Sequence, residues 1–224
     1  YASEEAVTFF NTAISLDEET PGLSTDTRRA RWHEQLGEAY YALGKHDESR
    51  THLNHALTLM GNRPPGPMWR HLTGLLWGVL VQTKHRLSGH SPAPAAETPD
   101  PLLISAARAN ERLCQIYYMD NAKIQSMNAA VTALNFAERA GTSPELARSY
   151  ANVSVTTALV TAYSLSNMYE RLALKTGTTV GHVASLAYAH EVVGLYHAGA
   201  GHFQQAGERM ADSIALADTI GDLR

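Results

Sequence analysis

The chain has 224 residues, of which 44% are hydrophobic and 18% are charged, and its formal net charge at neutral pH is −4. This balance argues against a nucleic acid as the main partner, because binding to phosphates requires a basic stripe. The single cysteine, Cys114, excludes a disulfide within the chain and fits a reducing compartment, so we expect a cytoplasmic protein.

Apolar residues recur along most of the chain with the period of an α-helix. They predict ten helices, over 2–17, 27–43, 46–60, 67–88, 102–119, 122–140, 144–159, 162–177, 180–199 and 203–220. The polar stretch "DEETPGLSTDT" (17–27) and the proline-rich stretch "SGHSPAPAAETPDP" (88–101) are typical of loops. We therefore expect one all-α domain over 1–224, in which any break would fall at 88–101.

Two of the predicted helices carry unusual apolar residues. In 2–17, Ala6, Phe10, Ala13 and Leu16 form one stripe, which is typical of the second helix of a pair whose first helix precedes it, as in a fragment of a larger protein. The segment 68–87 is the most apolar in the chain, but only 75–81 lacks polar side chains, whereas a membrane span needs about 20 largely apolar residues. We expect it to be a buried or partner-covered helix.

The phrase "LGEAYYALGKHDESRTHLNHAL" (36–57) recurs along the chain. Three starting points, Leu36, Leu113 and Val193, are each followed by similar residues at offsets of 4, 13, 17, 20 and 23 positions. These residues are Tyr40, Ser49, Leu53, Ala56 and Leu59; Tyr117, Ser126, Ala130, Ala133 and Phe136; and His197, Ala206, Met210, Ser213 and Leu216. The offsets place the first residues on one helix and the later ones on a second helix. Such pairs bury their apolar faces only by stacking on one another.

This pattern resembles the tetratricopeptide repeat, most closely at 32–59, less closely at 109–138 and 189–218, and in degenerate form at 145–177. The resemblance implies an all-α helical-repeat solenoid of about ten helices. The solenoid should be irregular, since the starting points are 77 and 80 residues apart instead of 68.

The stretches "ERLCQIYYMDN" (111–121), "ALNFAERAGTSPELARSYANVS" (133–154) and "ADTIGDLR" (217–224) resemble the helical region of large bacterial signal-transducing ATPases. Those proteins join the ATPase to an adenylate/guanylate cyclase-type domain or another effector. The resemblance implies a non-catalytic scaffold or regulatory sensor arm, which binds protein or the other domains of its parent chain. The parent would carry the ATPase or cyclase activity.

No recognisable catalytic, cofactor or metal motif occurs. The chain lacks HExxH, GxSxG, GxxxxGK[ST] and GxGxxG, and "TGTTVGHV" (176–183) is interpreted as a turn between helices. We interpret His46, His52 and His55 as solvated, and His190, His197 and Cys114 as packing residues. We therefore predict no catalytic residue, cofactor or metal, and no enzymatic activity in this chain.

In stacked helical pairs the first helices line a concave face, and their non-core positions face a ligand. By spacing, the candidate partner-binding residues are Arg31, Glu34, Glu38, Tyr41, Arg108, Glu111, Gln115, Tyr118, Tyr188, Glu191 and Leu195. Tyrosines among mixed charges suit a peptide or protein partner. Some tetratricopeptide repeats hold a C-terminal carboxylate with Lys and Asn at such positions, and Glu34 and Glu38 argue against that ligand here.

Two other functions stay open at this point. One is a small-molecule-sensing regulator, which an apolar pocket with a few convergent polar groups would favour. The other is an enzyme of unrecognised type, which a strongly perturbed pKa in a cleft would favour. Neither a nucleic acid nor a membrane is expected as partner, and a homo-oligomer stays open.

Overall fold

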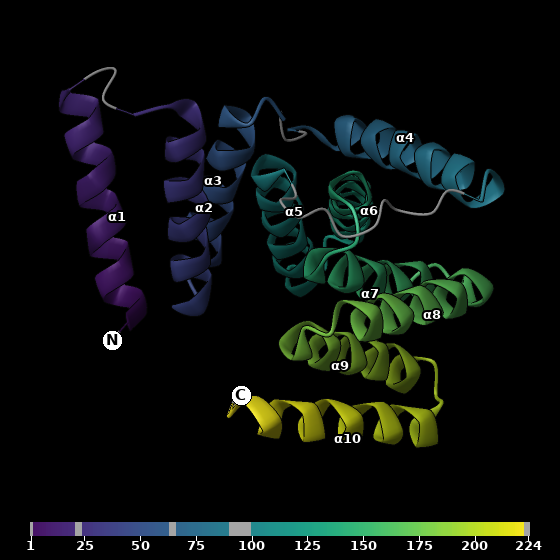
Figure 1. Ribbon diagram of the computed structural model, residues 1–224. Coiled ribbons are helices and arrows are strands. Elements are labelled where there is room, and N and C mark those ends of the chain that lie inside the picture. The colour runs from purple at the N-terminus through teal and green to yellow at the C-terminus, as the bar shows by residue number, and fades with distance from the viewer. Residues whose placement is uncertain (1, 21–23, 63–65, 90–99, 222–224) are drawn as a thin grey trace.

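A computed structural model describes residues 2–20, 24–62, 66–89 and 100–221. These residues form ten helices and no strand, which confirms the predicted all-α class (Figure 1). The helices are α1 (Ala2–Glu19), α2 (Asp26–Ala42), α3 (His46–Leu59), α4 (Met68–Leu87), α5 (Pro101–Met119), α6 (Lys123–Ala140), α7 (Pro144–Ala158), α8 (Tyr163–Val180), α9 (Val183–Gly199) and α10 (Phe203–Ile220).

The largest departure from the predicted boundaries lies between α8 and α9. The sequence predicts a turn over 176–183, but α8 continues to Val180 and the turn contains only Gly181 and His182. Gly177 is helical because α9 passes close to it, so that a Cβ on Gly177 would lie 2.9 Å from Leu186 Cδ1. Gly181 ends the helix with a φ of +70°, a conformation that glycine adopts without strain.

Consecutive helices pack in pairs, α2 with α3, α5 with α6, α7 with α8 and α9 with α10 (Figure 1). Small buried residues lie where the paired helices meet, as their spacing predicts. Ser49 and Ser126 are fully buried, and the Ser126 Oγ donates to the Cys114 carbonyl across the α5–α6 contact at 3.0 Å. The pairs then pack on one another, with α7 in contact with both α5 and α9.

One apolar core runs through the middle pairs. Its fully buried large side chains include Ile116, Leu134, Leu146 and Tyr150, and alanines fill most of the remaining core positions of α5, α6 and α7. Because alanine side chains are short, the helix axes can approach closely. The core therefore fixes α5, α7 and the helices next to them as a rigid support.

Helix α4 is an addition to this series of pairs and packs against α6. Gly78 of α4 lies close to α6, where a Cβ would come within 2.7 Å of Val131 Cγ1. The opposite face of α4 is exposed, with Trp69 at 60% and Trp77 at 69%. The sequence predicts a buried or partner-covered helix over 68–87, and α4 is buried on one face only. None of the described helices combines the length and apolar character that crossing a membrane requires.

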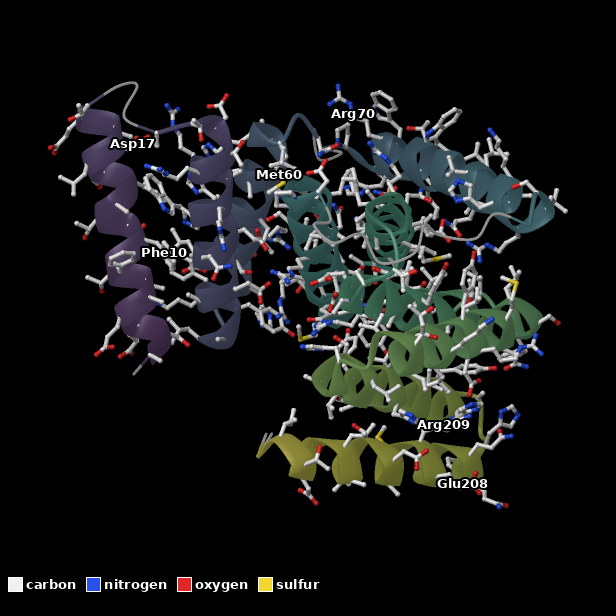
Figure 2. The ribbon with its side chains drawn as sticks, in the orientation of Figure 1. Phe10, Asp17, Met60, Arg70, Glu208 and Arg209 are labelled. Atoms are coloured by element: carbon white, nitrogen blue, oxygen red, sulfur yellow. The ribbon has the colours of Figure 1, made fainter. Side chains whose placement is uncertain are left out.

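Among the described elements, α1 contacts α2 alone, at one end of the molecule (Figure 1). The predicted apolar stripe of α1 is divided, because Phe10 (labelled in Figure 2) is half-buried while Leu16 is 56% exposed. Near the end of α1, the buried Asp17 pairs with Arg29 of α2 at 2.9 Å. The α1–α2 contact therefore combines a partial apolar stripe with one ion pair.

Candidate functional site

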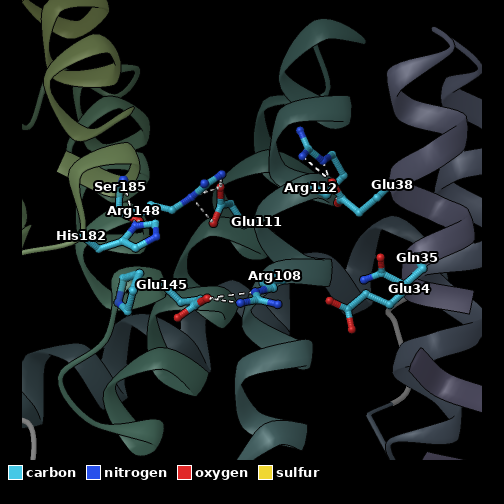
Figure 3. Close-up of a pocket in the computed structure, with 11 residues that line it drawn as sticks. Glu34, Gln35, Glu38, Arg108, Glu111, Arg112, Glu145, Arg148, His182 and Ser185 are labelled. Atoms are coloured by element: carbon cyan, nitrogen blue, oxygen red, sulfur yellow. Dashed lines mark hydrogen bonds and ion pairs between the residues drawn. The ribbon is translucent and has the colours of Figure 1, made fainter. Parts of the chain in front are cut away.

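Two neighbouring cavities lie along α2, α5, α7 and α9, and we call them together the groove. The first has a volume of about 420 Å³ and is lined by Glu34, Gln35, Glu38, Arg108, Glu111, Arg112, Pro144, Glu145, Arg148, His182 and Ser185 (Figure 3). The second has a volume of about 570 Å³ and is lined by Tyr41, Ala42, Arg112, Cys114, Gln115, Tyr118, Met119, Ser126, Arg148, Asn152, Val155, Thr156, Tyr188, Glu191, Val192 and Leu195. Arg112 and Arg148 line both cavities, so the cavities adjoin.

The direction of the chain is the same in all four helices of the groove. Each of α2, α5, α7 and α9, or the residue that caps it, contributes earlier residues to the first cavity and later residues to the second. These are the first helices of the four consecutive pairs. The groove therefore follows from the order of the pairs, and its two ends differ in chemistry.

The structure brings together ten of the eleven residues that the sequence predicts for the partner-binding face. Glu34, Glu38, Arg108 and Glu111 line the first cavity. Tyr41, Gln115, Tyr118, Tyr188, Glu191 and Leu195 line the second. Arg31 is exposed and lines neither.

The sequence prediction missed the contribution of α7. Arg148 and Asn152 both line the groove, yet the stretch 145–177 resembles a repeat too weakly to assign positions by offset. Arg112 was also missed, because it directly follows Glu111, which occupies the expected position. The four-residue spacing of Arg148 and Asn152 was the available signal, since it places both on one face of a helix.

Ion pairs across neighbouring helices neutralise the arginines of the first cavity (Figure 3). Arg108 Nη2 lies 2.6 Å from Glu145 Oε1, and Arg148 Nη2 lies 2.5 Å from Glu111 Oε1, so both pairs join α5 to α7. Arg112 pairs with Glu38 at 2.5 Å and joins α5 to α2. Since each of these cations already has a carboxylate partner, the first cavity offers polar contacts without a large net charge.

Two tyrosine rings hold the shared arginines in place. The Arg112 guanidinium lies 3.9 Å from the centre of the Tyr41 ring, and that of Arg148 lies 4.2 Å from the centre of the Tyr188 ring. Such cation–π contacts add to the ion pairs and restrict the guanidinium orientation. Arg112 and Arg148 thus form a fixed boundary between the two cavities.

Glu34 differs from the other carboxylates of the first cavity, because it is buried and has no arginine within ion-pair distance among the described residues. The Ser105 hydroxyl donates to it. Burial raises the pKa of Glu34 above its ordinary value, partly offset by the bond from Ser105 and by the field of Arg108. Glu34 therefore takes up a proton more readily than a solvated glutamate.

A directed chain of hydrogen bonds crosses the second cavity. Arg112 Nη1 donates to Gln115 Oε1 at 2.5 Å, Gln115 Nε2 donates to Tyr188 Oη at 2.8 Å, and Tyr188 Oη donates to Asn152 Oδ1 at 2.9 Å. Arginine only donates, so its bond fixes the direction of every later bond in the chain. The Asn152 amide nitrogen, Nδ2, is consequently a donor, and it is buried without an acceptor among the described residues.

The rest of the second cavity is mostly apolar. Val155 and Val192 line its wall, and the side chains of Tyr118 and Leu195 are 53% and 55% exposed. Buried in this setting, Tyr188 has a pKa raised well above its ordinary value, chiefly because burial disfavours the phenolate. Tyr188 therefore stays a neutral donor at physiological pH.

The interpretation of the solvated histidines needs correction at His46 and His52. His46 is half-buried and stacks on Tyr41, with 5.5 Å between the ring centres. His52 was expected to be solvated, but it is half-buried beside His33, with their Nδ1 atoms 3.0 Å apart, and His55 stacks on His33 at 4.1 Å between ring centres. Burial and the neighbouring histidines lower the pKa of His33 to about 4, and burial also lowers the pKa of His52. The ring that accepts must be neutral, because one Nδ1 donates while the other accepts.

His190, His197 and Cys114 were assigned correctly to packing. His197 is buried, with Nε2 3.1 Å from Glu170 Oε2, and His190 lies 3.3 Å from Asp212. Cys114 is buried, and burial raises the pKa of its thiol to about 12. Within the described ranges, no cluster of three or more His, Cys, Asp or Glu side chains could hold a metal ion.

A comparison with models of known protein families finds none that matches this chain. A comparison with curated proteins likewise finds no protein that matches its sequence.

Proposed function

We propose that the chain is a tetratricopeptide-like solenoid that binds a protein or peptide segment in its groove, as a non-catalytic interaction arm of a bacterial, cytoplasmic signalling protein. The solenoid arrangement is supported by the recurring offsets in the sequence and by the four consecutive helix pairs. The signalling context rests on the resemblance of 111–121, 133–154 and 217–224 to the helical region of bacterial signal-transducing ATPases. An ATPase or cyclase activity would belong to other domains of the parent chain.

One observation carries the binding proposal. Ten positions chosen from repeat spacing alone line two adjoining cavities, which run along the first helices of four consecutive pairs. A groove that crosses four helices suits an extended segment of polypeptide. Tyr41, Tyr118 and Tyr188 provide large contact areas with few rotatable bonds.

The chemistry of the groove defines the kind of segment. In the first cavity the paired arginines and glutamates favour polar, uncharged groups of the ligand, because an added charge would compete with an existing ion pair. The second cavity favours an apolar side chain. The unpaired Asn152 Nδ2 is placed to donate to a main-chain carbonyl beside that side chain, once the ligand has displaced the atoms that now cover it.

The test is selection of binding peptides from a random library displayed on phage, followed by titration of synthetic peptides. We expect enriched peptides to carry an apolar residue, and Leu195→Lys to weaken their binding about tenfold or more, as loss of one buried apolar contact implies. Leu165→Lys is the matched control, because Leu165 is 48% exposed on α8 and lines neither cavity. Equal binding by wild type and Leu195→Lys would refute the groove as the binding site.

A second candidate is a regulator that senses a small molecule, and the second cavity favours it. The cavity combines apolar walls with Gln115, Asn152 and Tyr188, which is the composition of many small-molecule sites. A screen of small apolar carbonyl compounds by thermal shift separates the two candidates. A compound that stabilises the wild type but not Asn152→Leu, in a protein that enriches no peptide, would favour the sensor.

A further inference from the structure

Helix α4 packs with its polar side inward. Gln82 is buried, and its Nε2 donates at 2.8 Å both to Asn135 Oδ1 and to Glu138 Oε2 of α6. Arg86 pairs with the same Glu138, and the Tyr169 hydroxyl donates to Gln82 Oε1 at 3.1 Å. These directional contacts fix the rotation of α4 about its axis.

The same rotation leaves the apolar side of α4 exposed. Trp69, Leu76, Trp77 and Leu80 are 60%, 63%, 69% and 55% exposed, and Leu72 and Val79 are also exposed. Apolar side chains at this spacing form a continuous stripe along the helix. An exposed apolar patch of this size on a folded protein marks a surface that meets another molecule or a membrane.

The stretch of sequence that contains this stripe carries charge of one sign. No Asp or Glu occurs between Glu48 and Glu97, a stretch that contains four arginines and one lysine. The rest of the chain carries 13 basic and 22 acidic residues. The segment that contains α4 is therefore cationic within an otherwise acidic chain.

Two of these cations lie on the exposed side of α4. Arg70, Trp77 and Lys84 are seven residues apart, so they share one face of the helix, and all three are exposed (Figure 2 labels Arg70). At 1.5 Å per residue, Arg70 and Lys84 lie about 21 Å apart along the axis, on either side of Trp77. Arg70 also lies over the Trp69 ring, 5.2 Å from its centre.

We propose that α4 docks on an anionic lipid surface, lying in the plane of the interface with Trp69, Trp77 and the leucines inserted and Arg70 and Lys84 at the headgroups. Tryptophan and leucine on one face are typical of helices that bind membranes in this way, and the long side chains of Arg70 and Lys84 can extend their charged ends to the headgroups. This inference is independent of the groove. It differs from the expectation that no membrane is a partner, because it involves a peripheral contact and no membrane span.

A second copy of the chain fits the stripe less well. An antiparallel pair of α4 helices would place Arg70 of each copy near Lys84 of the other, without an acidic residue on either helix to separate them. An anionic surface interacts favourably with both cations at once, and each basic residue increases the affinity for that surface about fivefold. The charge pattern thus selects the lipid surface over self-association.

The experiment measures binding of the whole chain to vesicles, by tryptophan fluorescence and by co-sedimentation. Vesicles of equal parts phosphatidylglycerol and phosphatidylcholine are compared with vesicles of phosphatidylcholine alone, in a Trp32→Phe background that leaves only the two tryptophans of α4. We expect a blue shift and binding to the anionic vesicles. Arg70→Gln with Lys84→Gln should weaken binding about 25-fold, and Trp77→Ser about tenfold or more.

Phe203→Ser is the matched control, because Phe203 is 75% exposed on α10, outside the α4 stripe, and its loss should leave vesicle binding unchanged. Circular dichroism checks that each variant keeps its helices. Equal binding to neutral and anionic vesicles, or no blue shift with either, would overturn the proposal. So would a stable dimer in analytical ultracentrifugation that Trp77→Ser dissociates, since the occupant would then be a second copy.

Discussion

The link between α4 and the rest of the molecule depends on one buried carboxylate. The Glu138 side chain is fully buried and accepts hydrogen bonds from Gln82 at 2.8 Å and from Tyr150 at 2.8 Å. His85 Nδ1 lies 2.6 Å away, and Arg86 provides the permanent positive charge. We predict that Arg86→Ala destabilises the chain strongly, because it leaves this carboxylate without its cation.

The magnitude follows from the burial of the pair. Removing one partner of a buried ion pair costs about 3–5 kcal/mol. Gln82 and Tyr150 still donate to Glu138 in the variant, so we expect about 3 kcal/mol. For a chain of this length that loss lowers the melting temperature by about 6–12 °C.

The assay is urea unfolding followed by circular dichroism, arranged as a double-mutant cycle with Glu138→Gln. In the Glu138→Gln background no buried carboxylate remains to lose its cation, so Arg86→Ala should cost about 1 kcal/mol or less, the value of an ordinary hydrogen bond. Hydrogen exchange of the amides of α4 and α6 measures the loss of stability in these two helices directly. This local measurement is needed if the helix pairs unfold in steps, because a single unfolding curve then averages over them.

Arg171→Ala on the exposed part of α8 is the control and should change stability by less than about 0.5 kcal/mol. If Arg86→Ala costs the same in both backgrounds, the contribution of Arg86 is packing and the electrostatic reasoning is wrong.

Three further predictions concern other parts of the molecule. The folded state holds the pKa of His33 near 4, so below pH 6.5 the unfolded state binds more protons than the folded state. The free energy of unfolding should therefore fall by about 2–3 kcal/mol as the pH drops from above 6.5 toward 4. In urea titrations at pH 7 and 4.5, His33→Leu should remove most of this difference. Gly78→Ala should destabilise the chain by about 1–3 kcal/mol, because the added Cβ would meet Val131. Gly207→Ala, in the open part of α10, should stabilise the chain by about 0.5–1 kcal/mol. If thermal melts show that both variants shift the melting temperature in the same direction, the close α4–α6 contact is contradicted. Cys114, buried and with a pKa raised to about 12, should react with a thiol reagent only after unfolding, and rapid labelling of the native protein would disprove its burial.

Much of the architecture could be predicted because the relevant signals are local. The 3.6-residue period of apolar side chains locates all ten helices, since each helix must bury one stripe. The recurring offsets place small residues such as Ser49 and Ser126 at helix crossings, where both are fully buried. The same offsets place Tyr41, Gln115 and Tyr188 on the groove, because positions that avoid the core of a first helix face outward on the same side of each pair.

The features that could not be predicted all depend on residues far apart in the chain. The alignment of α2, α5, α7 and α9 determines which cations pair with Glu38 and Glu111, and it makes the Asn152 amide nitrogen a donor. Arg148 could not be predicted, because the repeat that contains it is too degenerate to assign positions by offset. The pairing of His33 with His52 depends on the α2–α3 contact, which leaves His52 half-buried instead of solvated.

Helix α4 illustrates the division most clearly. Its apolar composition was evident from its residues, but which side it buries was not, because the apolar stripe alone predicts the opposite orientation. Gln82, Arg86 and the two close-packed glycines, Gly74 and Gly78, decide the orientation through Asn128, Val131, Asn135 and Glu138 of α6. Local periodicity therefore determines that a helix forms, whereas buried polar partners and backbone proximity, which only the tertiary structure supplies, determine which face it shows to other molecules.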